Sequence, residues 1–398
     1  MTNRTIEQHT GFIVYKSEIH NEQTFITVAI TENTPDAVKT AAQVFNRIAA
    51  IISEEKLQIF QERIFGETAL FPQIQDVRQA AYEKKQVDSD LQATFIEGIP
   101  AWGSGIAGVQ IRAISMSSDD DRLWTIFEND TACGRGWKRN GATYLFFQNM
   151  HGYKNGNGTD NSRMAQTERM FERTDSLLQQ QGVGYRNVVR TWIYLHEILD
   201  WYGEFNQVRN EKYKNYKIIT NNSNPNTDYE AIPLPASTGI LASNPINAAA
   251  VMDALAIVPE TDATVEIKQV TGIKQRSPYR YGSAFSRAMS VREPEHTTIF
   301  LSGTAAIDEK GNSVFPGDTK AQIKKTLEVV DALIEDEGAT VKDICNATVF
   351  LKRAVDLPIY YETIRELGLE GLPAVCVVAD VCRDDLLFEI DATIIAEK

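Results

Sequence analysis

An internal repeat is the sequence feature that most restricts what this chain can fold into. The stretch GVGYRNVVRTWIYL (182–195) lies over GATVKDICNATVFL (338–351) without a gap. Each stretch is typical of a helix that ends at glycine, followed by a short turn and a strand. The closing stretches that begin at Pro235 and Pro373 also align without a gap. The repeat therefore predicts at least two copies of one structural unit.

A third and weaker copy is expected at the N-terminus. Strands at 25–30 and 59–65, a helix opened by Pro35 and a closing strand at 107–114 repeat the same order of elements. A chain of 398 residues with 43% hydrophobic residues is long enough to bury several cores. We predict an α+β protein in which mixed sheets pack on helices, with three domains at 1–118, 119–260 and 261–398.

Composition argues against several kinds of partner and site. A net charge of −14 is unsuited to binding nucleic acid. Neither a signal peptide nor an apolar run of the ~20 residues that a membrane span needs is present, so we expect a cytoplasmic protein. The histidines form no HxH or HExxH motif, and no GxGxxG or P-loop occurs, so we expect no metal and no cofactor. Reduced thiols are expected at all four cysteines, which are Cys133, Cys345, Cys376 and Cys382.

Glu389 is the unexpected residue of the last predicted strand. It lies between Phe388 and Ile390, where a carboxylate either points to solvent from a half-buried strand or occupies a pocket as a titrating group. The repeat favours the pocket, because Val251 takes the place of Glu389 in the second copy. In the weaker alignment of the first copy, Gln110 falls near that place. We therefore predict one active pocket per chain.

The order of elements resembles that of the Rid family (YjgF type, with the bacillus chorismate-mutase-like fold). The resemblance rests on IFLSGTAAID (299–308), on the stretch at 338–351 and on PAVCVVADVCRDDLLFEIDA (373–392). It covers the third copy from end to end, the second clearly and the first faintly. Rid proteins are homotrimers with ligand sites between neighbouring subunits. The resemblance thus implies an intrachain pseudo-trimer, with the sheets turned inward and the best pocket between the second and third copies.

The chain departs from the imine-deaminase members of that family at one position. Those members carry an arginine directly after Pro-Ala of the closing strand, where it clamps the substrate carboxylate, but here that position is Val375. An aliphatic side chain cannot replace a bidentate clamp. Deamination of an amino-acrylate is therefore disfavoured, although the family's glutamate is kept as Glu389.

A closer resemblance is to the chorismatase group, two-domain relatives that remove pyruvate from chorismate. RTWIYL, YGEFNQVRNEKY, PAST, SPYRYGSAFSRAM and ADVCRDDLLFEID occur in the order of that group, which leaves residues 1–90 as an extension. Glu389 would be the catalytic acid, because apolar surroundings favour the neutral carboxyl that must protonate an enol ether. The resemblance further implies that Cys382 lines the ring, with a hydroxybenzoate (3-hydroxybenzoate favoured) or a dihydroxycyclohexadiene carboxylate as product.

Chorismate carries two carboxylates, so its site needs cationic anchors and hydroxyl donors. Each arginine alone is more often a surface residue or part of a structural ion pair, and tyrosines at helical spacing are more often core or rim residues. Glycine in a strand would let a ligand approach the backbone closely. The candidate binding residues are Arg209, Arg287, Arg383, Tyr202, Tyr213, Tyr281, Ser302, Gly303 and Thr304.

Two other functions remain open from the sequence. The chain could be a Rid-type imine or enamine deaminase, which release of ammonia from an imino acid would reveal. It could also be a binding protein that uses the same pocket without turnover, although the intact Glu389 weighs against this. In every case we expect a small anionic ligand such as a dicarboxylate, no nucleic-acid or membrane partner, and a monomeric pseudo-trimer or loose oligomer.

Overall fold

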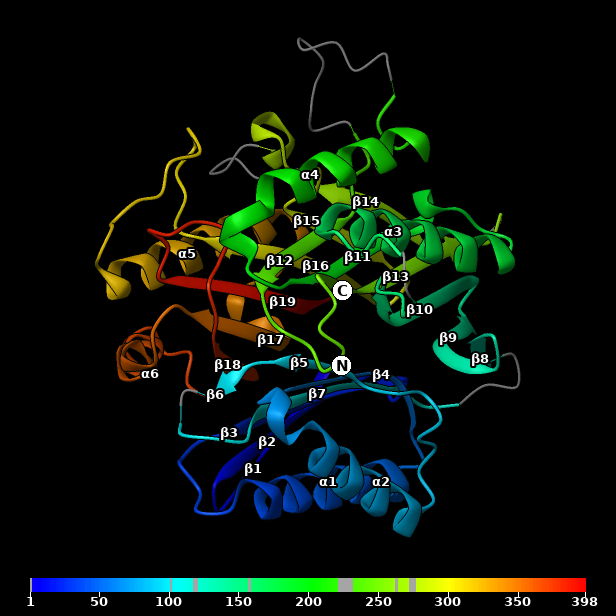
Figure 1. Ribbon diagram of the computed structural model, residues 1–398. Coiled ribbons are helices and arrows are strands. Elements are labelled where there is room, and N and C mark those ends of the chain that lie inside the picture. The colour runs from blue at the N-terminus through cyan, green and yellow to red at the C-terminus, as the bar shows by residue number, and fades with distance from the viewer. Residues whose placement is uncertain are drawn as a thin grey trace.

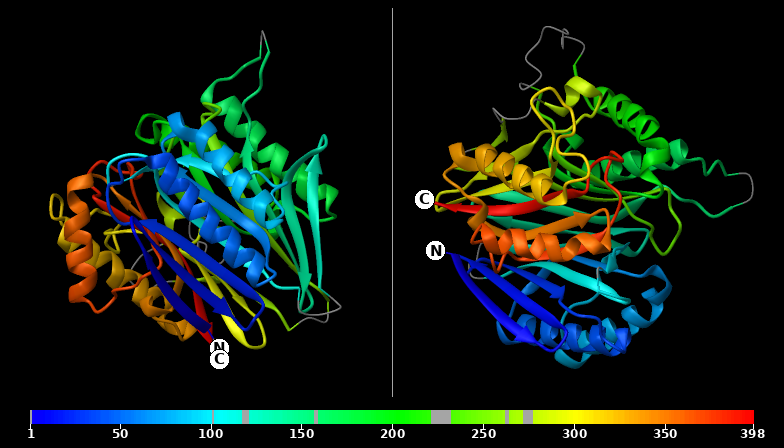
Figure 2. Two further views of the ribbon diagram at one scale, coloured as in Figure 1. Left: turned by 90° about the horizontal axis from the view of Figure 1, so that it is seen from below. Right: turned by 90° about the vertical axis from the view of Figure 1, so that its left-hand side faces the viewer.

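The computed structural model describes residues 2–100, 102–116, 121–156, 159–220, 232–261, 264–271 and 277–398. In these ranges the chain forms three mixed sheets with their helices, which we call the first, second and third units. The sheets face one another inside the molecule and the helices cover the outside (Figure 1). Figure 2 shows the same arrangement from two further sides, with both chain ends on one side of the molecule. This is the α+β pseudo-trimer that the repeat and the family resemblance predicted.

The first unit contains a six-stranded sheet under two helices. Its strands, in spatial order, are β1 (Thr2–His9), β2 (Phe12–Ile19), β3 (Gln23–Ile30), β7 (Ile106–Ile114), β4 (Gln58–Gly66) and β5 (Thr94–Glu97). The helices are α1 (Ala37–Glu54) and α2 (Phe71–Lys85). Asp36 caps α1 by accepting a hydrogen bond from the Lys39 amide, and Val44, Phe45 and Ile48 form the buried stripe that packs on the sheet.

The second unit repeats this order with a six-stranded sheet. Its strands are β12 (Ala236–Leu241), β11 (Val188–Leu195), β13 (Ala250–Pro259), β10 (Ala142–His151), β9 (Thr131–Arg139) and β8 (Arg122–Glu128), with helices α3 (Arg163–Gln180) and α4 (Ile198–Asn215). The third unit has seven strands: β14 (Glu266–Val270), β15 (Ala288–Arg292), β16 (His296–Ala305), β19 (Phe388–Glu397), β17 (Ile344–Leu351), β18 (Ala374–Val378) and β6 (Ile99–Pro100). Helices α5 (Thr319–Ile334) and α6 (Leu357–Glu366) cover it.

Short 3₁₀ helices join these elements at η1 (Thr68–Leu70), η2 (Tyr185–Asn187), η4 (Pro278–Tyr281), η5 (Glu335–Glu337), η6 (Val341–Asp343) and η7 (Ala354–Asp356). Strand β6 departs from the plan of the repeat, because it follows the first unit in sequence but pairs with β18 of the third. The domain boundaries at residues 118 and 260 stay a prediction. Among the helices described, none is long and apolar enough to cross a membrane.

The three sheets share one hydrophobic core. Phe60 of β4, Trp137 of β9 and Phe300 of β16 belong to the same buried cluster although they come from different units. Burial of apolar surface between the sheets is the main favourable contribution to such docking. The units therefore form one body around a common centre, as a Rid-type pseudo-trimer requires.

Strand pairing establishes which residues correspond between the second and third units. In both sheets a one-residue bulge interrupts the pairing near the start of β11 and of β17. Tyr194 and Phe350 lie at the same distance after the bulge in their strands. Tyr194 pairs with Val251 and Phe350 pairs with Glu389, so Val251 and Glu389 occupy equivalent positions. The prediction that valine replaces the glutamate in the second unit is confirmed.

The first unit corrects the weaker alignment by two residues. A bulge at the corresponding place in β4 again sets the count, and Gly108, opposite Phe65, occupies the position of Glu389. Gln110 instead pairs with Arg63 and corresponds to Asp391. Because side chains alternate with a period of two, a shift of two residues preserves the buried face and leaves no mismatch for sequence analysis to detect.

Candidate functional site

A cavity of about 310 Å³ lies between the second and third units. Helix α4 and strand β12 form one wall, while β16, β19 and the segments before β15 and β19 form the other. The lining residues are Tyr202, Gly203, Asn206, Arg209, Ser237, Gly239, Ser283, Phe285, Arg287, Gly303, Ala305, Ile307, Cys382, Arg383 and Glu389. The place of the cavity agrees with the expectation drawn from the family resemblance.

Glu389 contributes a buried carboxyl group to this cavity. It lies on β19 opposite Ala305, and only 5% of its surface is exposed. Burial, together with the charge of Asp391, raises the pKa of Glu389 to about 8, against the opposing effect of Arg287 and Arg190. Near neutral pH the group is therefore mostly protonated and able to donate a proton.

Gly303 makes room for that carboxyl group. It lies within the β16 bulge between Leu301 and Thr304, where the pairing with β19 shifts. A Cβ atom at residue 303 would lie 2.1 Å from Oε1 of Glu389. Any larger residue at position 303 would displace the carboxyl group, so glycine is required there for steric reasons.

Two of the three candidate arginines flank the same aromatic ring. Arg209, on α4, is 1% exposed and donates to the Asn206 amide oxygen, with its guanidinium 5.3 Å from the Phe205 ring centroid and 5.5 Å from that of Phe285. The guanidinium of Arg287 lies 5.8 Å from the Phe285 centroid. Arginines held on aromatic faces are pre-organised donors for a carboxylate.

The third arginine and its neighbour lie in the loop between β18 and β19. Arg383 donates from Nη1 to the Gly311 carbonyl oxygen at 2.6 Å, which fixes it at the cavity wall. Burial and the charge of Glu389 raise the pKa of Cys382 to about 12, and burial raises the pKa of Tyr202 to about 12. Both groups are neutral near pH 7, so Cys382 lines the cavity as a thiol and not as a thiolate nucleophile.

Tyr213 is not part of the cavity wall. It lies in the core of the second unit, with its ring 5.6 Å from that of Tyr185 and 6.0 Å from that of Phe171. The physical reason is distance along α4, because eleven residues after Tyr202 correspond to about 16 Å of helix. The core interpretation of Tyr213 is thus the right one. The side chain of Tyr281 lies outside the described residues.

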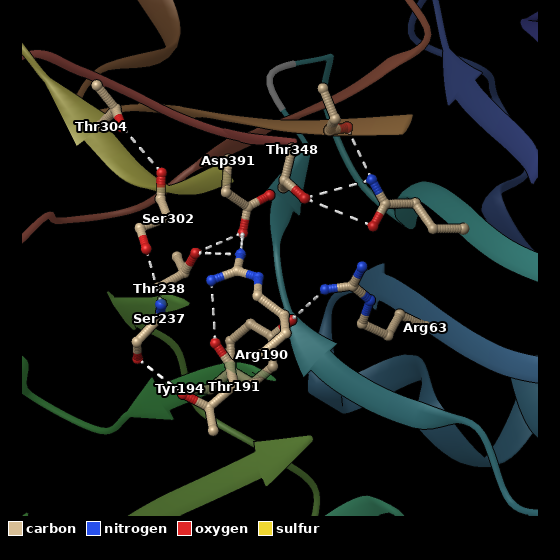
Figure 3. A network of polar contacts seen from close by, with 12 residues as sticks. Arg63, Arg190, Thr191, Tyr194, Ser237, Thr238, Ser302, Thr304, Thr348 and Asp391 are labelled. Atoms are coloured by element: carbon tan, nitrogen blue, oxygen red, sulfur yellow. Dashed lines mark hydrogen bonds and ion pairs between the residues drawn. The ribbon is translucent and has the colours of Figure 1, made fainter. Parts of the chain in front are cut away.

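Ser302 and Thr304 also serve the backbone and not the cavity. The Ser302 hydroxyl accepts a hydrogen bond from the Ser237 amide at 2.8 Å (Figure 3). It also donates to the Ser286 carbonyl oxygen at 2.6 Å. Thr304 donates to the Ser302 carbonyl oxygen at 2.9 Å. Of the three consecutive candidates, Gly303 alone lines the cavity.

Sequence analysis missed several lining residues. Gly203 and Asn206 lie within one turn of Tyr202 and Arg209 on α4, so helical spacing could have identified them. Phe285 lies two residues before Arg287, but nothing in the sequence indicated that its ring would meet Arg209. That contact depends on how α4 of one unit docks against the next.

Val375 does not line the cavity that contains Glu389. It is fully buried on the far side of the third unit, where its methyl groups lie 2.7 and 2.8 Å from the place of a Cβ on Gly108. The closing strand that faces Glu389 belongs to the second unit, and there Ser237 lines the cavity. The cavity therefore has no arginine at the clamp position, as predicted. The residue that occupies this position is Ser237 and not Val375.

A buried ion pair lies behind the cavity. Asp391 Oδ2 accepts a hydrogen bond from Arg190 Nη2 at 3.1 Å and from Thr238 Oγ1 at 2.8 Å (Figure 3). Arg190 and Thr238 come from the second unit and Asp391 from the third. Within the described ranges, no group of three or more His, Cys, Asp or Glu side chains is placed to hold a metal.

Comparison with solved structures supports the tandem arrangement. The chain is similar to a crystal structure of a chorismatase with a TM-score of 0.52 and 18% sequence identity, over 72% of this chain and 82% of that one. At this identity the likeness shows a shared fold.

Comparison with known sequences places the C-terminal part in a family. Residues 281–396 match the family model described as Endoribonuclease L-PSP. A RutC family protein of Pyrococcus abyssi is 34% identical over 95 residues, which cover 24% of this chain and 75% of that protein. The 3-aminoacrylate deaminase RutC of Acinetobacter baylyi is 30% identical over 93 residues, or 23% of this chain and 74% of that protein. With its third unit matched in this way, the chain belongs to the Rid family, which includes the RutC and endoribonuclease L-PSP proteins.

Proposed function

We propose that the protein is a chorismatase-like enzyme that protonates the enol ether of chorismate and releases pyruvate. The observation that carries the proposal is the buried carboxyl group of Glu389, with its pKa raised to about 8 chiefly by burial, in one cavity with Arg209, Arg287 and Arg383. An enol ether needs a neutral acid, and a dicarboxylate needs more than one cation. The fold shared with a chorismatase supports the same reading.

The proposed reaction begins with transfer of the Glu389 proton to the methylene carbon of the enol ether. The carbon–carbon double bond becomes a methyl group beside an oxocarbenium ion, and Glu389 becomes a carboxylate. Water adds to the cationic carbon and returns a proton to Glu389, which gives a hemiketal. Its collapse breaks the bond to the ring oxygen and releases pyruvate and a dihydroxycyclohexadiene carboxylate. Attack by the neighbouring ring hydroxyl instead of water would give a cyclic ketal and return the proton to Glu389. Cleavage of that hydroxyl's bond to the ring and loss of the ring proton at the ether carbon would then make the ring aromatic, and collapse of the remaining hemiketal would release pyruvate and a hydroxybenzoate.

The cavity residues have separate roles in this proposal. The three arginines hold the carboxylates and favour the substrate orientation in which the methylene carbon meets Glu389. Cys382 and Tyr202 stay neutral and line the ring, so they add no anion that would compete with the substrate for the arginines. Neither is assigned a proton transfer.

The direct test is to incubate the purified protein with chorismate. Pyruvate would be followed with lactate dehydrogenase and NADH, and the ring product would be identified by its ultraviolet spectrum and chromatography. We expect one pyruvate per chorismate consumed, with 3-hydroxybenzoate as the favoured ring product. Chorismate left intact between pH 5 and 9 by demonstrably folded protein would refute the proposal.

A second candidate function is deamination of an imine or enamine. The 30% identity to a 3-aminoacrylate deaminase favours it, and the serine that faces Glu389 from β12 counts against it, because it offers no bidentate clamp. Ammonia release from an enamine generated in the assay would distinguish this activity from pyruvate release from chorismate.

Arg383→Ala should weaken substrate binding more than turnover. Loss of a charge-assisted hydrogen bond of about 1.5–3 kcal/mol corresponds to a rise in KM of about 10- to 160-fold. Steady-state kinetics with chorismate would measure KM and kcat separately. The matched control is Arg353→Ala, because Arg353 pairs with Asp356 at the start of α6 and lies outside the cavity. An unchanged KM for Arg383→Ala would remove this residue from the binding site.

Gly303→Ala should reduce turnover by about 10²-fold or more, because its Cβ would occupy the space 2.1 Å from Oε1 of Glu389. The rate of pyruvate release at saturating chorismate gives the measurement. Gly184→Ala serves as the control, since a Cβ there meets nothing within 4 Å. Equal rates for the two variants would mean that the position of the Glu389 carboxyl group does not matter.

A further inference from the structure

We propose that Asp391 is a positioning residue for Glu389: with Arg190 and Thr238 it forms a buried cluster that keeps the Glu389 carboxyl group protonated and directed into the cavity. Its effect on catalysis rests on the proposed function, whereas its effect on the titration of Glu389 does not. The inference concerns residues behind the cavity, which would not touch a substrate.

The strand geometry places the two carboxyl groups on one face. Glu389 and Asp391 are two residues apart on β19, and side chains two apart point to the same side of a sheet. Their Cα atoms are therefore about 6.6 Å apart, with both side chains directed toward the second unit. Asp391 is 3% exposed, so its charge acts on Glu389 with little screening by water.

The contacts from the second unit hold the Asp391 side chain in one position. Arg190, which is fully buried, donates from Nη2 to Thr238 Oγ1 at 2.6 Å as well as to Asp391, and from Nη1 to the Thr191 carbonyl oxygen at 3.1 Å. Its guanidinium also lies 4.6 Å from the Trp192 ring centroid. A carboxyl group held in a triangle of this kind cannot rotate toward Glu389 without breaking hydrogen bonds.

Asp391 opposes the positive charges that lie near Glu389. Arg190 and Arg287 favour the ionised form of Glu389, and Asp391 opposes them. Arg63 of the first unit adds a further positive charge near Asp391 and Arg190. Burial of Glu389 favours its neutral form, and without the Asp391 charge these cations would oppose burial alone and shift the group toward the carboxylate, which cannot protonate a substrate.

The remaining groups around Glu389 do not supply the missing charge. Cys382 and Tyr202 face it as neutral groups, because burial raises the pKa of each to about 12. Arg209, on the opposite wall, is another cation. Among the described neighbours, Asp391 is therefore the anion that acts together with burial to keep the acid protonated.

The second unit provides a matched internal control. Asp253 pairs with Trp192 on β11 as Asp391 pairs with Thr348 on β17, and it accepts from Thr94 Oγ1 at 2.6 Å and from the Asn149 amide at 2.9 Å. The aspartate is present there without the glutamate, so a buried aspartate can serve sheet docking alone. The experiment must therefore measure the titration midpoint of Glu389, because a change in stability alone would not reveal the role of Asp391.

The experiment follows the Glu389 carboxyl carbon by NMR in protein labelled with ¹³C-glutamate, with Glu389→Gln identifying the signal. Asp391→Asn should lower the titration midpoint by about one to two pH units, the effect of one charge about 6.6 Å away at an effective dielectric constant of about 20. Arg190→Met should raise it, and the double variant should return it toward the wild-type value. Asp253→Asn should leave it unchanged. The alkaline limb of pyruvate release should move in the same directions.

The results separate a charge effect from a structural one. Opposite shifts for Asp391→Asn and Arg190→Met support the proposal, whereas no shift, or shifts in the same direction, would overturn it. If circular dichroism shows that Asp391→Asn alone is unfolded, the double variant, which removes the buried pair together, is compared with Arg190→Met: a lower midpoint in the double variant supports the proposal, and an equal midpoint overturns it. The midpoints could shift as expected while the protein leaves chorismate intact. That result would refute the proposed function but would support the role of Asp391. If the protein releases pyruvate from chorismate but the midpoints do not move, the proposed function would stand and the role of Asp391 would be refuted.

Discussion

Glu389→Gln should bind chorismate and release pyruvate about 10²- to 10⁴-fold more slowly than the wild type. Glutamine keeps the shape of the side chain but cannot transfer a proton, and general acid catalysis usually contributes a factor of this size. Binding should persist because the three arginines are unchanged. Calorimetric titration at low temperature would give Kd, and rapid-quench measurement of pyruvate would give the rate of the chemical step.

The control for this experiment is Glu362→Gln, which changes an exposed glutamate on α6 that pairs with Lys320. It should behave as the wild type in both measurements. A wild-type rate of pyruvate release from Glu389→Gln would show that the proton comes from another group. Loss of binding together with turnover would instead assign Glu389 to substrate recognition.

The same substitution should stabilise the free protein, and increasingly so as the pH rises. The pKa of Glu389 is raised from 4.5 to about 8, so between these values the unfolded chain has released a proton that the folded protein keeps. The stability contributed by the neutral carboxyl group is complete below pH 4.5 and is lost progressively up to about pH 8. At pH 7 the loss amounts to about 3 kcal/mol, which glutamine does not incur.

Urea unfolding of both proteins at pH 5, 6, 7 and 8 would check this expectation. The free energy of unfolding of Glu389→Gln should exceed that of the wild type by a margin that grows by about 1.4 kcal/mol per pH unit and then levels off. Groups common to both proteins cancel in the difference. A margin independent of pH would mean that the carboxyl group titrates normally in the folded protein.

Sequence analysis predicted the fold from the repeat, because ungapped copies of helix, turn and strand specify the same pairing twice. A pocket for Glu389 was also expected from the sequence, since a carboxylate in an apolar strand has few physical explanations, and the residue lines the cavity. The alignment of the first unit was shifted by two residues, so that Gln110 and not Gly108 was matched to Glu389. Side chains in a strand alternate with a period of two residues, so a shift of two cannot be recognised from the pattern of apolar residues. Tyr213 was wrongly included, since distance along α4 and not residue type excludes it.

The remaining parts of the site depend on how the units dock, which no single stretch of sequence encodes. Val375 faces the first unit, and the residue that faces Glu389 from a closing strand is Ser237 of the second. Phe285 meets Arg209 across the same boundary. The pair of Arg190 and Asp391 joins residues 201 positions apart. Only the packed sheets bring these groups together.

Both walls of the cavity belong to one polypeptide, and this has a consequence for dilution. A site shared by separate subunits is lost when the protein is diluted below the dissociation constant of the oligomer, by mass action. Here the second and third units are tethered through the chain, so each remains at a high effective concentration for the other however few molecules are present. The cavity is thus a unimolecular feature, retained at the lowest protein concentrations.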